Sequence, residues 1–141
     1  GSQYLTSSKL LDSSRRHVTY GGQPETWIVK RLGQRFTIMH EHLEEYLFTA
    51  EDKFLNGDHK VYTWIPGKIL PNGFWDIRKK TGQIVSIVDT TYSQCLSTDR
   101  AFGWISTREK PNCADTNLEW ILTEVMCSQE RFAVEEYITI E

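Results

Sequence analysis

Alternation of apolar and polar positions is the dominant pattern along the chain, and it predicts short β-strands. In segments such as 27–29, 36–38 and 85–87, β-branched and aromatic side chains are enriched and hydrophobic residues recur with a period of two. Turn-forming pairs such as 21–22 and 56–57 separate these segments. The spacing of three to four residues that indicates helices is nearly absent. The pattern therefore predicts an all-β protein.

Three anchors recur in the same order three times along the chain. Each copy has a leucine followed by small polar residues, then a charged pair before an apolar strand, then a tryptophan that opens an alternating strand. The leucines and tryptophans of the three copies are Leu5, Leu47, Leu96, Trp27, Trp75 and Trp120. We expect repeats over about 3–43, 44–92 and 93–141, with about four strands in each.

Twelve short strands in three similar units fit few architectures. A barrel capped by hairpins around a pseudo-threefold axis describes the β-trefoil, whereas a three-bladed propeller leaves little room for a packed axis. Closure into a barrel also removes exposed strand edges. We therefore expect a single β-trefoil domain over residues 3–141, with the six anchor residues in layers of its core. Residues 1–2, Gly-Ser, are expected to be the remnant of a purification tag.

Length and composition narrow the class of protein. A chain of 141 residues suits one domain, and 39% apolar with 25% charged residues is typical of a globular rather than a disordered or fibrous protein. No apolar run approaches the roughly 20 residues that a membrane-spanning helix needs, so no membrane span is expected. The formal charge of −3 and the scattered basic residues argue against a nucleic-acid partner.

The sequence offers no recognisable catalytic or metal-binding motif. It has no nucleophile beside a base, no carboxylate pair and no ligand cluster at a familiar spacing. His40 and His42 would share one face of a strand with Glu44, but no further ligand follows at a motif spacing. We expect a protein that is not an enzyme and that holds neither a metal nor a cofactor.

The candidate ligand-binding residues are acidic and aromatic side chains that follow the second anchor. They are Asp58 with Tyr62 and Trp64, and Asp99 with Trp104. An aromatic ring can stack on the apolar face of a sugar while a carboxylate orients its hydroxyl groups. In the first repeat Asp12 and Tyr20 are followed by Gly21, so we expect at most two sites. In the alternative interpretation, the two tryptophans are structural caps of the barrel mouth.

A resemblance to a known group of proteins supports the fold. Segments 45–50, 58–67 and 75–77 resemble the trefoil repeats of secreted insect proteins, including mosquito salivary and haemolymph proteins. The chain is more distantly similar to the C-terminal trefoil of silkworm haemolymph low-molecular-weight lipoproteins and to fascin. The resemblance spans nearly the whole chain and implies a secreted trefoil protein. It does not select a function, because trefoils include lectins, inhibitors, cytokines and cytoskeletal binders.

The ricin-B branch of trefoil lectins carries a Gln-any-Trp motif, which this chain lacks. Glu25, Gly73 and Leu118 stand two residues before the anchor tryptophans. We therefore expect a monomeric secreted module that binds a carbohydrate or glycoconjugate by other means. The alternative is a protein-interaction domain of a salivary or haemolymph protein, inhibitor-like or binding a host protein, and the polar loop 106–117 suits such a contact.

The secretion that this resemblance implies bears on the three cysteines. Cys95 stands where the other repeats carry Tyr4 and Tyr46, so we expect it to be buried and unpaired. Cys113 and Cys127 have no counterparts in the other repeats and fall in turn or loop segments. In a secreted protein we expect them to form a disulfide.

Overall fold

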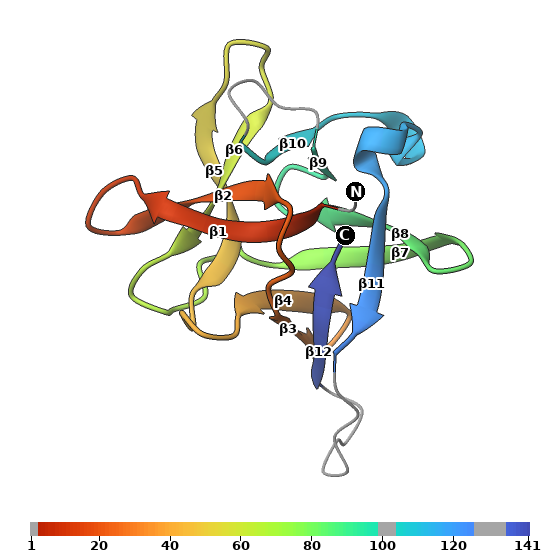
Figure 1. The fold of residues 1–141 in the computed structure, drawn as a ribbon. Helices are drawn as coiled ribbons and strands as arrows, with labels where there is room; N and C mark the ends of the chain where they lie inside the picture. Colours follow the sequence, from red (N-terminus) through yellow and green to blue (C-terminus); the bar gives the residue numbers. More distant parts are fainter. Residues whose placement is uncertain (1–2, 99–103, 126–134) are drawn as a thin grey trace.

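A computed structural model describes residues 3–98, 104–125 and 135–141 and shows an all-β protein (Figure 1). Strands make up 57% of the described residues and helices 5%. Two short 3-10 helices, η1 (Pro111–Cys113) and η2 (Thr116–Leu118), lie in the loop before β11. Residues 126–134 of the third expected repeat lie outside the described residues.

The strands alternate along the chain and pair antiparallel with their neighbours. Their bounds are β1 (Tyr4–Leu10), β2 (Arg15–Gly21), β3 (Trp27–Leu32), β4 (Arg35–His40), β5 (Tyr46–Lys53), β6 (His59–Trp64), β7 (Trp75–Thr81), β8 (Ile84–Asp89), β9 (Cys95–Ser97), β10 (Ser106–Arg108), β11 (Trp120–Glu124) and β12 (Glu135–Ile140). Each of the three expected repeats thus contains four of these strands.

Nine of the strands form a closed barrel. The ring of pairings runs β6-β10-β9-β8-β11-β12-β3-β4-β5 and returns to β6. β2 pairs with residues 62–64 of β6, and β1 pairs with β2. β7 pairs with both β4 and β8. In Figure 1 the β1–β2, β5–β6 and β7–β8 hairpins project outward in different directions. Closure leaves no unpaired edge around this ring.

The six anchor residues lie at the centre of the main core. Leu5, Leu47, Leu96, Trp27, Trp75 and Trp120 all have no exposed surface. Each indole N–H donates to the carbonyl of the leucine in its own repeat, at N···O distances of 3.0 Å, 3.1 Å and 2.9 Å in chain order. A buried N–H without such a partner would cost about 1–3 kcal/mol. The same contact therefore satisfies the buried polar atom of each tryptophan.

The structure corrects the disulfide expected from the sequence. Cys113 is bonded to Cys95, with the two Cα atoms 5.8 Å apart, so both the Cys113–Cys127 pairing and the unpaired Cys95 are wrong. Cys127 lies outside the described residues. Cys95 is buried as expected, but the loop that follows β10 folds back so that Cys113 packs beside it with Val88 and Leu118. Alignment of the repeats could not show that Cys113 packs against Cys95, because the loop that carries Cys113 has no counterpart of the same length in the other repeats.

Candidate functional site

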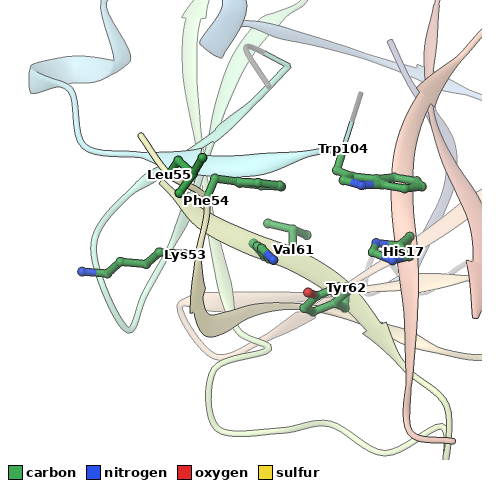
Figure 2. A pocket seen from close by; sticks show the side chains of 8 residues that line it. His17, Lys53, Phe54, Leu55, Val61, Tyr62 and Trp104 are labelled. Carbon is green, nitrogen blue, oxygen red and sulfur yellow. The ribbon is translucent and has the colours of Figure 1, made fainter. Parts of the chain in front are cut away.

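A pocket of about 230 Å³ opens beside the β5–β6 hairpin, outside the main core (Figure 2). It is lined by His17, Lys53, Phe54, Leu55, Lys60, Val61, Tyr62 and Trp104. These residues come from β2, from β6, from the β5–β6 turn and from the segment before β10. The site therefore depends on the tertiary arrangement and not on one local motif.

One wall of the pocket is a stacked pair of rings. The imidazole of His17 lies against the indole of Trp104, with ring centroids 4.0 Å apart and planes inclined by 15°. Trp104 is held there because it forms a β-bridge with Thr19, and because the next residue, Ile105, donates its N–H to the carbonyl of Val18. Figure 2 shows Phe54 on the opposite side of the pocket, facing this pair.

The floor of the pocket contains Tyr62, whose hydroxyl is already engaged. Tyr62 is 1% exposed and donates to the Asp52 carboxylate over 3.3 Å. Burial, and then the nearby charge of Asp52, raise the pKa of Tyr62 to about 12. The Arg15 guanidinium lies 5.0 Å from the Tyr62 ring centroid and forms ion pairs with both Asp12 and Asp52. The two carboxylates on this side therefore share the single positive charge of Arg15.

Lysines surround the other sides of the pocket. Lys53 and Lys60 line it, and the Lys60 ammonium lies 5.3 Å from the centroid of the Phe54 ring. The ammonium of Lys9 lies 5.9 Å from the centroid of Trp104. Burial lowers the pKa of His17, and the positive charges of Lys9, Lys60 and Arg15 lower it further. The pocket therefore combines aromatic walls with a positive potential.

The structure brings together only two of the five predicted ligand-binding residues. Tyr62 and Trp104 both line the pocket. Asp58 instead accepts hydrogen bonds from Arg108 and Ser106, which ties the β5–β6 hairpin to β10. Trp64 does not line the pocket and packs edge-on against Phe48, in a small apolar cluster that also contains Tyr62. Asp99 lies outside the described residues.

Sequence reasoning missed His17, Phe54 and Lys60 as lining residues. Phe54 precedes the Asn-Gly turn and is 7% exposed, although its neighbour Leu55 is 97% exposed. His17 lies directly opposite Tyr62 in the β2–β6 pairing, which the sequence pattern alone does not indicate. The one available signal was the basic and aromatic content of two hairpins, which does not reveal that they meet.

The histidines considered for metal binding have other roles. His40 is buried, and its Nε2 lies 2.7 Å from the Glu25 carboxylate while its Nδ1 accepts from the N–H of Leu43. His42 is largely exposed. Within the described ranges, no three His, Cys, Asp or Glu side chains lie close enough to hold a metal ion. The same part of the chain contains no helix with the length and apolarity to cross a membrane.

The comparisons with known proteins identify mosquito salivary proteins of similar structure. No family model and no curated protein matches the chain. A solved salivary protein of Culex quinquefasciatus, of the Cysteine and Tryptophan-Rich (CWRC) family, is 27% identical with a TM-score of 0.77, over 84% of this chain and 83% of that one. A second Culex salivary protein of that family is 20% identical with a TM-score of 0.72, over 83% and 81%, and shows the shared fold alone. The expected resemblance to mosquito salivary proteins is therefore confirmed.

Proposed function

We propose that this chain is a secreted, non-enzymatic β-trefoil module whose pocket beside the β5–β6 hairpin binds a sugar residue of a glycan. The observation that carries the proposal is the aromatic pocket itself, in which Trp104 and Phe54 face each other above Tyr62. Aromatic rings present the apolar surface on which sugar rings pack. The volume is below the roughly 300–1,000 Å³ of pockets for drug-sized ligands, which suits a single ring.

The internal recurrence of the chain supports the trefoil. Four strands fall in each expected repeat, and the same tryptophan-to-leucine hydrogen bond occurs once in each. A trefoil places three such units around one axis. A crystal structure tests this directly, since rotation by about one third of a turn must superpose each Trp–Leu pair on the next.

Secretion and the absence of catalysis have separate support. The Cys95–Cys113 disulfide is typical of proteins from oxidising compartments, and the structural neighbours are salivary proteins. The side chains that line the pocket include one histidine but no hydroxyl or thiol nucleophile other than the engaged Tyr62. General acid–base or covalent chemistry needs such a partner within hydrogen-bond reach.

A glycan array followed by a titration that monitors tryptophan fluorescence tests the sugar-binding function. A sugar seated against Trp104 is expected to change the emission of the native chain, and Trp104→Phe is expected to lose that change while keeping the fold. Trp64→Phe is the matched control, because Trp64 does not line the pocket. No saturable change with any array hit would contradict the proposal.

Exposed leucines at the tips of two hairpins favour protein binding as a second candidate function. Leu55 is 97% exposed in the β5–β6 turn, and Leu10 and Leu11 are 55% and 41% exposed in the β1–β2 turn. Exposed apolar side chains at hairpin tips suit contacts with a protein surface. Leu10→Ser and Leu11→Ser separate the two functions, because neither leucine lines the pocket: they are expected to leave glycan binding intact and to weaken capture of a protein partner.

A further inference from the structure

Most polar groups on the described side chains that face the pocket donate hydrogen bonds, and the acceptors among them are the bare nitrogen of neutral His17 and the Tyr62 oxygen. Figure 2 shows the nitrogen-bearing edges of Trp104 and His17 directed toward the pocket. An indole N–H and an ammonium group can only donate. None of the lining residues carries a carboxylate or an amide, and the Tyr62 hydroxyl is already bonded to Asp52. Within the described part of the chain, the Trp104 and His17 rings have no hydrogen-bond partner of their own.

The described charged residues around the pocket also carry a net positive charge. Among the residues that the structure describes, no carboxylate lies within 4.0 Å of the ammonium groups of Lys9, Lys53 or Lys60. Asp12 and Asp52 share the one positive charge of Arg15, which leaves one net negative charge on this side against the three lysines. A sugar hydroxyl both donates and accepts, so a neutral sugar would leave several of these donors unused.

Building on the proposed glycan function, we propose that the bound sugar carries a carboxylate or a sulfate, and that this oxyanion lies between Lys60 and the nitrogen-bearing edges of Trp104 and His17. An oxyanion only accepts hydrogen bonds, so it matches the donors of Lys60 and Trp104 and an N–H of His17. Charge-assisted hydrogen bonds of this kind are about twice as strong as neutral ones. Lys9, beside Trp104, adds to the attraction without needing direct contact.

Matched pairs of sugars test the inference by calorimetric titration of the full chain. Sialyllactose is compared with lactose, and 6-sulfo-N-acetylglucosamine with N-acetylglucosamine. We expect at least one charged sugar to bind about tenfold more tightly than its neutral partner, with the advantage falling between about 20 mM and about 150 mM salt. The two pairs distinguish a carboxylate from a sulfate as the recognised group.

Variants locate the recognised charge. Lys60→Gln is expected to weaken the charged sugar about tenfold and to leave the neutral sugar unchanged, while Lys60→Arg retains most of the affinity. Lys68→Gln makes the same charge change at an exposed residue outside the pocket and is expected to have no effect. Lys9→Gln lies on a different hairpin and provides a second test should Lys60→Gln fold poorly.

The outcomes separate this inference from the function on which it rests. Equal binding of charged and neutral sugars, with no effect of Lys60→Gln, would overturn the oxyanion inference and leave glycan binding intact. Binding of phenyl sulfate or benzoate without binding of any sugar would overturn the glycan function and support the oxyanion site. Binding of neither a sugar nor a simple organic anion would overturn both.

Discussion

The imidazole of His17 and the indole of Trp104 are stacked at a centroid distance of 4.0 Å, although they lie in different thirds of the chain. This contact joins the β1–β2 hairpin, which lies outside the barrel ring, to the segment that enters β10. It gives the pocket a wall whose charge depends on pH, because the usual pKa of histidine is about 6.5.

The pH dependence of ligand binding is expected to follow His17. Burial and the neighbouring Lys9, Lys60 and Arg15 lower the His17 pKa in the free protein, and a bound oxyanion would raise it again. Binding of a charged sugar then takes up a proton, so its affinity rises as the pH falls through the range below about 6.5. Titrations between about pH 7.5 and pH 5.5 check this, and His17→Gln is expected to flatten the profile.

The same shift predicts the sign of the effect on stability in the absence of ligand. The folded state binds the His17 proton more weakly than the unfolded state does, so its contribution to stability is lost as the pH falls below about 6.5. Comparing the free energies of urea unfolding of the wild type and of His17→Gln across this pH range isolates the contribution of His17 to stability. A wild type that gains stability relative to the variant on acidification would contradict the environment described here.

Trp104→Ala and Trp64→Ala are expected to separate binding from stability. Trp104 is partly exposed and lines the pocket, so its loss should abolish sugar binding and cost little folding free energy. Trp64 packs against Phe48 and does not line the pocket, so its loss should lower the unfolding temperature and weaken binding far less than the loss of Trp104. Affinity and thermal melting measured on both variants check the split. The reverse result would place the site at Trp64.

Leu47→Ala is expected to destabilise the protein by about 2–5 kcal/mol, because Leu47 has no exposed surface and its carbonyl accepts the Trp75 indole N–H. Denaturant unfolding measures the change. Leu10→Ala is the matched control, since Leu10 is 55% exposed and its loss should cost well under 1 kcal/mol. A cost for Leu47→Ala no larger than that of the control would remove Leu47 from the core.

Loss of the Cys95–Cys113 bridge is expected to cost about 3 kcal/mol by the chain-entropy estimate, given a sequence separation of 18. The double replacement of both cysteines by serine, followed by chemical unfolding, tests this figure. Peptide mapping without reduction tests the pairing itself. A recovered peptide that links Cys113 to Cys127 would contradict the bridge described here.

The anchor residues were predictable because their environment repeats. Three tryptophans and three leucines at corresponding positions of the repeats indicate a shared role in the core. All six are fully buried there. Burial on a regular strand is set largely by local alternation and by the repeat, both of which are visible in the sequence.

The pocket was not predictable in the same way, because it forms where the repeats differ. Trp104 meets His17 only through the bridge between Trp104 and Thr19, which joins segments far apart in the sequence. Asp58 follows the same second anchor as Tyr62, yet its carboxylate is used by Arg108, a contact between hairpins that no local pattern encodes. The return of Cys113 to Cys95 has the same origin.

The three tryptophan-to-carbonyl hydrogen bonds also bear on the order in which the chain folds. They join residues 22, 28 and 24 positions apart, whereas the ring is sealed by β12 against β3, with Ile138 opposite Trp27. The entropic cost of joining two residues grows with the length of chain between them. We therefore expect the thirds to order before the ring is sealed, so that the indole protons become protected from exchange earlier than the amides of β12 in pulse-labelling experiments. A chain still emerging from the ribosome would then hold ordered thirds while its last strand is missing, and β3 would remain an open edge until residues 135–140 arrive.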